Sequence, residues 1–216
     1  MPSLPLFPLG TTLLPGGRLP LRVFEPRYVV LLRDLLEQPG DERGFGVVAI
    51  RRGFEVGGEL DNDLHGVGCL AVLDEIAEAG DAMFVVLATG TRRFRLDGID
   101  RGAGTPYLTG EVTWLDEPLG QPAKTVPLVT RVRAVVSGYR ASLGLEELDL
   151  PSDPTELSYL AAPAVGLDTG ERQRILASPD TASRLSLVLR LVQREMALTS
   201  SLGVVASLPD GPSSLN

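Results

Sequence analysis

The sequence predicts an α+β protein in which a β-rich N-terminal half with one inserted helix precedes a helical C-terminal half. Three observations support this class. Between residues 44 and 114, short β-branched and alternating segments are typical of strands. Beyond a proline-containing stretch at residues 116–126, the apolar period changes to about 3.5, the spacing of helices that pack on other helices. One helical pattern interrupts the strands early, at residues 26–40.

A strand-to-helix corner at residues 24–28 introduces the early helix. It follows an apolar segment at 4–9, a Gly/Pro turn at 15–17 and an expected strand at 19–23. After the corner the apolar residues fall on one helical face, at Tyr28, Leu31, Leu32, Leu35 and Leu36. The sequence therefore predicts an amphipathic helix directly after a strand.

The corner residues suit the start of that helix. Pro26 fits the first helical position, where its missing N–H removes a donor that would be unpaired anyway. Glu25 places a carboxylate near the positive end of the helix dipole. Gly40, after Pro39, is the expected stop.

The stretch that follows predicts a small closed or partly closed barrel of about six strands. Further strands are expected at 44–52, 66–79, 83–89, 90–96 and 107–114. The segment 66–79 is ambiguous, and its flanking glycines favour strand over helix. Residues 53–65 are rich in Gly, Asp and Asn and predict a long loop, and Gly80 with Asp81 predicts a turn.

The helical half is expected at residues 127–202, after a β-rich subdomain at 1–117 and a linker at 118–126. Its first helix carries an apolar seam at Val129, Val132, Val136, Tyr139 and Leu143. Asp153 with Glu156, and Asp168 with Glu171, predict the capped starts of two more helices. A final helix follows residues 178–180, and residues 203–216 are expected to be a flexible tail.

Composition and charge exclude several classes of function. Of the 216 residues, 44% are hydrophobic and 22% are charged, which is a globular composition. The net charge of −8 and the pI of about 4.8 argue against binding to nucleic acid or to a membrane surface, because both need clustered Lys and Arg. Without a signal-peptide pattern or a stretch of roughly 20 apolar residues, we expect a cytoplasmic protein.

No set of residues predicts catalysis, a metal site or a cofactor. Cys69 and His65 are the only residues of their types, and on a strand they would stand ~13 Å apart, against the ~3 Å of proton transfer. Residues 66–71 match a dinucleotide-binding fingerprint, but a loop precedes them and a strand is expected to follow. No phosphate-binding loop is present, and the one lysine, Lys124, lies in the expected linker, where it cannot be desolvated.

Three groups of residues together resemble the Lon protease N-terminal (substrate-binding) domain family. They are the opening segments 6–9, 14–16 and 19–28, the Arg-Phe-Arg strand at 90–96, and the helical half from 157 to 195. The resemblance covers the chain to about residue 202 and implies a PUA-like barrel followed by a helical bundle. It also implies a stand-alone form of the domain, without the ATPase and peptidase domains and without catalytic residues.

The candidate site is a peptide groove between the barrel and the helical half, lined by Phe24, Glu25, Arg27, Tyr28, Arg93 and Trp114. The alternative is that the same residues have a purely structural role. Glu25 and Arg27 would then fix the corner by capping and a salt link, and Arg93, like Arg95, would belong to a solvated strand face. Trp114, the only tryptophan, is expected to fill the joint between the halves.

The resemblance implies a non-catalytic module that binds proteins or peptides, with an adaptor or a quality-control factor as its specific forms. Its partners would be unfolded or flexible protein segments, or a protease or chaperone. Apolar walls with a few polar groups suit such a groove. The alternative is a small-molecule binder or an enzyme that reuses the groove between the halves.

Overall fold

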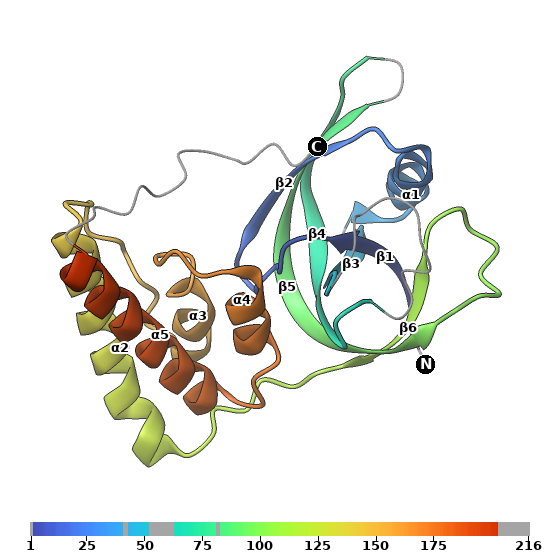
Figure 1. Cartoon of the computed structure of the whole chain (residues 1–216). Coiled ribbons are helices and arrows are strands. Elements are labelled where there is room, and N and C mark those ends of the chain that lie inside the picture. Colours follow the sequence, from blue (N-terminus) through green and yellow to red (C-terminus); the bar gives the residue numbers. More distant parts are fainter. Residues whose placement is uncertain (1, 41–42, 52–62, 81–82, 203–216) are drawn as a thin grey trace. The chain divides into compact units, whose positions relative to one another are not determined.

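The computed structural model describes residues 2–40, 43–51, 63–80 and 83–202. The chain divides into two compact units, and the boundary between them lies between Leu115 and Asp116. Among the described residues, the first unit holds six strands and one helix, and the second holds four helices (Figure 1). The predicted α+β class is confirmed.

The first unit is a barrel with one strand outside its closed ring. The strands are β1 (Ser3–Leu9), β2 (Arg18–Val23), β3 (Gly44–Ala49), β4 (Val67–Glu78), β5 (Phe84–Ile99) and β6 (Thr109–Trp114). They pair in the order β2-β5-β4-β3-β1-β6, and a further pairing of β5 with β6 closes the ring. β1 and β3 are parallel, and the other pairs are antiparallel. The prediction of a small barrel with an early helix is therefore confirmed.

β5 is long because its two ends pair with two different strands. Its first part, residues 84–89, pairs with β2, and its last part, residues 94–99, pairs with β6. The sequence predicts two strands here, at 83–89 and 90–96, but the structure runs straight through Gly90. A Cβ at position 90 would lie 2.4 Å from the backbone oxygen of Leu14. Close packing, not a chain break, explains this glycine.

The interior of the barrel is filled by one large aromatic ring and the aliphatic residues around it. The buried cluster consists of Leu4, Leu6, Val48, Ile50, Leu64, Phe94 and Val112. Neighbouring strands present glycines to Phe94, because a Cβ at Gly68 would lie 2.4 Å from its ring and one at Gly46 would lie 2.8 Å away. Since protein interiors are close-packed, the ring fits only where both positions lack a side chain.

Helix α1 (Pro26–Leu36) packs on the outer side of β1. Phe7 follows Leu6 along the strand, so it faces away from the barrel interior, and its ring stacks on Tyr28 with the centroids 4.0 Å apart. The predicted apolar stripe is buried at Leu31, Leu32 and Leu35. Burial of this stripe is what holds α1 on the sheet.

The ends of α1 agree only partly with the sequence prediction. Pro26 does occupy the first turn, as predicted. The helix ends at Leu36 with Glu37 as its C-cap, so the prediction of Gly40 as the stop is wrong. The apolar stripe itself ends there, and without further apolar residues to bury nothing favours another turn.

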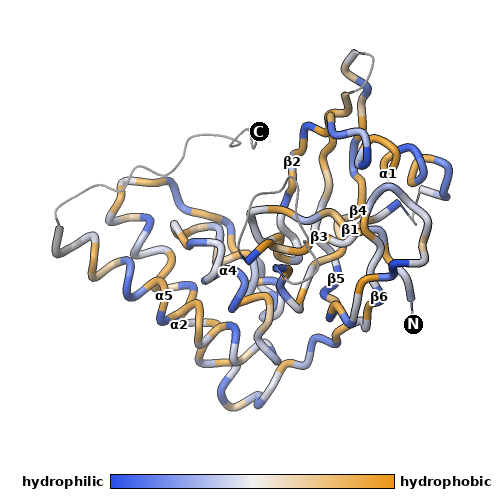
Figure 2. Tube along the Cα trace, turned by 45° about the vertical axis from the view of Figure 1, so that its right-hand side comes forward, coloured by the Kyte–Doolittle hydropathy of each residue, from blue (hydrophilic) through white to orange (hydrophobic). Residues whose placement is uncertain are grey.

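The second unit consists of helices α2 (Pro122–Ser142), α3 (Pro154–Leu160), α4 (Thr169–Leu176) and α5 (Thr181–Leu202). The predicted seam of α2 is confirmed at Val132, Val136 and Tyr139, which are buried, whereas Val129 is half-buried and Leu143 lies just beyond the helix. Hydrophobic and hydrophilic stretches alternate along α2 and α5, as expected for helices with one buried side (Figure 2). Asp153 caps α3, and Asp168 forms a capping box with Glu171 at α4, as predicted.

The expected linker at 118–126 is shorter in the structure, because α2 begins at Pro122. Two prolines, Pro118 and Pro122, favour an irregular segment, but Pro122 stands in the first turn of the helix, where a proline is tolerated. Lys124 therefore lies in the first turn of α2, where it is exposed, rather than in a linker. No helix within the described ranges has the length and apolar character needed to cross a membrane.

Candidate functional site

The corner between β2 and α1 is organised by one ion pair and one aromatic stack. Arg27 donates from Nε and Nη2 to Oε2 of Glu25 over 3.0 and 2.8 Å, and its Cζ lies 4.5 Å from the centroid of the Tyr28 ring. Tyr28 in turn stacks on Phe7. The predicted salt link is thus confirmed. The predicted side-chain cap is wrong, because the carboxylate of Glu25 accepts from Arg27 and makes no cap hydrogen bond.

Phe24 at the same corner is turned to solvent and belongs to an exposed face of two paired strands. It follows the last residue of β2 and is 54% exposed, and Val85 of β5 is 44% exposed. Val85 stands opposite Arg22 of β2, and Pro20 stands opposite Leu87. We call this surface, made of Pro20, Arg22, Phe24, Val85 and Leu87, the β2–β5 face. It presents apolar side chains, together with Arg22, on a hydrogen-bonded pair of strands.

Arg93 corrects the prediction of a solvated, charged strand face. It keeps only 2% of its surface exposed, whereas the side chain of Arg95 is 57% exposed and bonds Asp97. Alternation along a strand shows which residues share a face, but it does not show whether that face is covered. The prediction is therefore wrong for Arg93 and right for Arg95.

Trp114 extends the aromatic packing of the barrel interior. Its ring meets that of Phe94 edge to face with centroids 6.2 Å apart, and Arg92 lies over it with Cζ 4.9 Å from the centroid. Tyr28, by contrast, packs on the outer side of β1. The structure thus brings Glu25, Arg27 and Tyr28 together, while Trp114 belongs to a different cluster. A groove between the two units stays a prediction.

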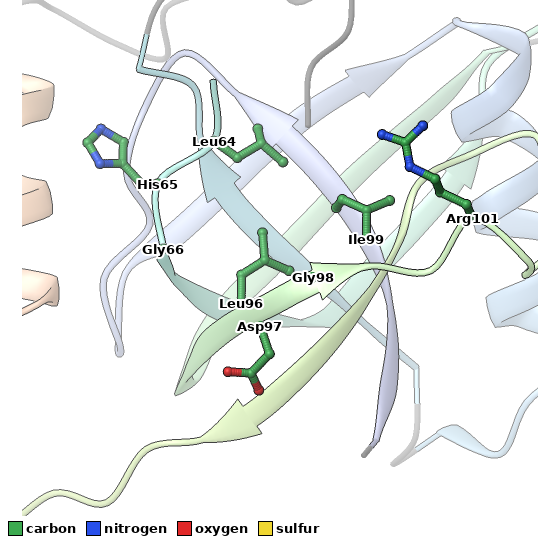
Figure 3. A pocket seen from close by; sticks show the side chains of 8 residues that line it. All are labelled: Leu64, His65, Gly66, Leu96, Asp97, Gly98, Ile99 and Arg101. Carbon is green, nitrogen blue, oxygen red and sulfur yellow. The ribbon is translucent and has the colours of Figure 1, made fainter. Parts of the chain in front are cut away.

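A cavity of about 290 Å³ opens at the barrel between the start of β4 and the end of β5. Figure 3 shows that Leu64, Leu96 and Ile99 converge on it, while the side chains of His65 and Asp97 point away. Asp97 accepts 2.6 Å hydrogen bonds from Thr113 and Arg95, and these bonds lower its pKa. Burial, and then the charge of Arg51, lower the pKa of His65, which favours its neutral form. The wall of the cavity thus combines apolar side chains with Arg101, while His65 and Asp97 point elsewhere.

The residues weighed for chemistry do not form a reactive site in the structure. Residues 67–71 of the fingerprint lie on β4, a strand, so no helix terminus faces a phosphate there, in agreement with the structural interpretation. Cys69 is fully buried and directs its Sγ toward the backbone oxygen of Leu70. Across the described parts of the chain, no three His, Cys, Asp or Glu residues gather as metal ligands would.

A buried charge network in the second unit escaped the sequence prediction. Arg184 of α5 is 0% exposed, and it donates to Glu117 over 2.6 Å and to Ser158 over 2.9 Å. Tyr159 donates to both carboxylate oxygens of Glu117 over 2.9 Å, and Arg184 lies over its ring. The network ties the segment before α2 to α3 and α5. The sequence feature that could have indicated this network is the place of Arg184 on the apolar face of α5, beside Leu185 and Val188.

Comparison with known proteins gives a family for this architecture. The family model described as the ATP-dependent protease La (LON) substrate-binding domain matches residues 3–194. Lon protease 2 of Sorangium cellulosum (strain So ce56) is 28% identical over 204 residues, which are 90% of this chain and 25% of that protein. Lon protease 2 of Myxococcus xanthus is 27% identical over 200 residues, 89% of this chain and 24% of that protein. The chain thus spans about a quarter of these relatives.

Solved structures agree with the family match. The crystal structure of a Lon N-terminal domain protein from Xanthomonas campestris has a TM-score of 0.62 and 27% identity, and the match covers 88% of this chain and 98% of that one. The N-terminal domain of the Mycobacterium avium complex Lon protease has a TM-score of 0.64, over 89% of this chain and 98% of that one. At 15% identity, the second match supports the fold alone.

Proposed function

We propose, from the premise that this chain belongs to the LON substrate-binding domain family, that it is a non-catalytic module that binds unfolded or flexible segments of other proteins. The observation that carries the proposal is the β2–β5 face. Phe24, directly after β2, is 54% exposed, and Val85 of the paired strand β5 is 44% exposed. An unfolded segment differs from a folded one in showing its apolar side chains, and this face offers them apolar area on a preformed support.

The affinity of such binding is limited by the conformational entropy that the flexible segment loses when it is bound. Fixing a flexible chain opposes association, so modest affinity is expected, with a dissociation constant in the micromolar range, or about −8 kcal/mol. A Phe-rich segment without acidic residues would contact the apolar side chains of this face, and salt should therefore change its affinity little. A nucleic-acid ligand would behave differently, because phosphate contacts weaken steeply with salt. The net charge of −8 also opposes such a ligand.

The wider role that we propose is that of an adaptor or quality-control factor. The curated relatives are named Lon proteases, and this chain corresponds to about a quarter of them. A module that holds a client without chemistry of its own acts through a partner, which would be a protease or a chaperone. We therefore expect that the purified protein neither hydrolyses ATP nor degrades an unfolded substrate. Turnover that is undiminished in a Lys124→Ala variant and follows the protein through several columns would contradict this.

A second candidate is a small-molecule binder, or an enzyme that reuses a cavity of the fold. The cavity of about 290 Å³ favours it, because Leu64, Leu96 and Ile99 give it apolar walls. Ligand sites of this size combine apolar walls with convergent polar groups. His65 and Asp97 point away from the cavity, and Arg101 alone is not a convergent set of polar groups, so the peptide-binding proposal is the stronger one (Figure 3).

The test is fluorescence anisotropy with a labelled, unfolded, Phe-rich peptide and with a short RNA, each at low and at physiological salt. We expect micromolar, nearly salt-independent binding of the peptide and weaker binding of the RNA. The double variant Phe24→Ser and Val85→Ser should bind the peptide about tenfold more weakly, since two apolar anchors are lost. Val126, which is 69% exposed in the second unit, provides the matched control as Val126→Ser. RNA binding tighter than peptide binding, or equal loss in both variants, would refute the proposal.

A further inference from the structure

Strand β2 has one paired edge and one open edge. It pairs with β5 from residue 18 to residue 23, and it stands at the end of the strand order, outside the closed ring (Figure 1). Arg18, Pro20 and Arg22 make no backbone hydrogen bond to a described residue beyond that ladder. An open edge of this kind is a template for another strand.

The register shows which backbone groups face the open edge. The N–H of Gly90 donates to the oxygen of Gly17 over 2.9 Å, directly before the ladder begins. Hydrogen-bonded and non-hydrogen-bonded pairs alternate along an antiparallel ladder, so Leu19, Leu21 and Val23 bond to β5. Arg18, Pro20 and Arg22 then direct their backbone groups outward. Pro20 has no N–H to offer, which is tolerated at an outward-facing position, and its carbonyl remains an acceptor.

The side chains on the exposed face of this strand alternate between basic and apolar. Arg18, Pro20 and Arg22 are all exposed, and Phe24 continues the period. Within the described residues, neither Arg18 nor Arg22 takes part in an ion pair. An incoming strand would therefore find two guanidinium groups ready for carboxylates, with apolar surface between and beside them.

A second copy of the chain is a poor occupant for this edge. Two β2 strands paired antiparallel about Pro20 would place Arg18 of each opposite Arg22 of the other. Like charges that face each other directly across a ladder are destabilising. The same charges favour a strand with acidic residues at those positions.

We propose that β2 accepts an extended polypeptide segment as an additional antiparallel strand, one in which apolar and acidic residues alternate on one face. This rests on the proposed function and specifies how the segment is bound. In this register the segment presents, from its N-terminus, an apolar residue to Phe24, an acidic one to Arg22, an apolar one to Pro20 and an acidic one to Arg18. The backbone supplies affinity and the alternate side chains supply selectivity.

The probe is the labelled peptide acetyl-Thr-Phe-Thr-Glu-Thr-Val-Thr-Glu-Thr-amide, measured by anisotropy against the unmodified protein. Two N-methylated forms separate strand pairing from side-chain contact. Methylation of both Glu amides removes donors that point at β2 and should weaken binding at least about tenfold. Methylation of the Thr residues before each Glu alters amides that point away and should change affinity less than about twofold. Equal loss in the two forms would overturn the proposal.

Charge reversal tests the selectivity at Arg22. An Arg22→Glu variant should bind the probe about fivefold more weakly and should bind a form with Lys in place of both Glu residues about fivefold more tightly. Arg131→Glu, an exposed arginine of α2, provides the control and should alter neither affinity. If the variant binds both peptides like the unmodified protein, the register is wrong.

The unfolded Phe-rich peptide keeps the two proposals distinguishable. If it binds and the alternating probe does not bind at millimolar protein, strand addition at β2 is refuted while the proposed function stands. If neither peptide binds, both fail. Should Arg22→Glu lose its native far-ultraviolet spectrum, the N-methylated pair still decides the question on the unmodified protein.

Discussion

The rings of Phe7 and Tyr28 lie 4.0 Å apart and are inclined by only 16°. This contact fixes the start of α1 against the first strand of the barrel. Phe24, at the same corner, is 54% exposed. Two aromatic residues of one short segment therefore differ in role, since Tyr28 stabilises the corner and Phe24 faces solvent.

Truncation of each aromatic residue should separate stability from binding. Tyr28→Ala should lower the free energy of unfolding by about 3–5 kcal/mol, because it empties a buried ring position. Phe24→Ala should change it by no more than about 0.5 kcal/mol and should weaken peptide binding. Urea unfolding followed by circular dichroism measures the first quantity. A larger stability loss for Phe24→Ala than for Tyr28→Ala would contradict the assignment.

Substitution of two nearby glycines should have opposite consequences. A Cβ at Gly68 would lie 2.4 Å from the Phe94 ring and 2.7 Å from the backbone oxygen of Val47, so Gly68→Ala should destabilise the protein by about 1–3 kcal/mol or more. Nothing lies within 4 Å of a Cβ at Gly66, and Gly66→Ala should be neutral or stabilising by up to about 1 kcal/mol. Thermal unfolding of the two variants makes the comparison. Equal melting temperatures would show that the barrel interior is not filled as described.

Removal of the buried guanidinium group of Arg184 should lower the free energy of unfolding. Arg184→Met deletes its bonds to Glu117 and Ser158, and we expect a loss of about 2–4 kcal/mol, below the full value for a buried pair because Glu117 is 32% exposed. Arg190→Met, an exposed position on the same helix, is the control and should stay within about 0.5 kcal/mol. The measurement is the urea midpoint. Similar midpoints for the two variants would mean that the network contributes no net stability.

Alkaline pH should weaken the contact between α1 and the loop before β6. Tyr107 donates to Asp34 over 2.7 Å, and burial, then this bond and the charge of Asp34, raise the pKa of Tyr107 to about 12. The neutral phenol is the form favoured by folding, so its stabilisation is complete below pH 10 and is lost as the pH rises through about 12.

Difference titration of tyrosinate absorbance between the native protein and Tyr107→Phe should isolate this group near pH 12. In Asp34→Asn the pKa should fall but stay above its ordinary value, because burial is the larger cause. Titration of Tyr107 near pH 10 in the native protein would refute the buried contact.

The elements that the sequence predicts well are those with a strong local pattern. The stripe of α1, the central part of the seam of α2, and the caps at Asp153 and Asp168 stand as predicted. Each depends on residues a few positions apart, where helix periodicity and capping chemistry act directly. The sequence does not predict the end of α1 at Leu36 or the start of α2 at Pro122. A glycine or a proline is compatible with a helix boundary but does not by itself fix its position.

The candidate site was predicted only in part, because exposure is a property of the folded chain. Phe24 is exposed as a binding residue should be, yet Arg93 is buried. The partners of Val85 and Arg22 are set by strand register, which no local pattern specifies. The Glu117–Arg184 pair joins residues far apart in the sequence, and such pairs follow from topology alone.

The position of β1 has a consequence for biosynthesis. This strand, the first in chain order, lies between β3 and β6, and β6 ends at Trp114. While the chain is being made on a ribosome, one edge of β1 therefore has no partner until Thr109–Trp114 has been released. Leu4 and Leu6, which face the barrel interior, stay accessible through that interval, together with an open strand edge. A chain interrupted before Thr109 would keep that edge and should aggregate, whereas one that ends after Trp114 can close its barrel.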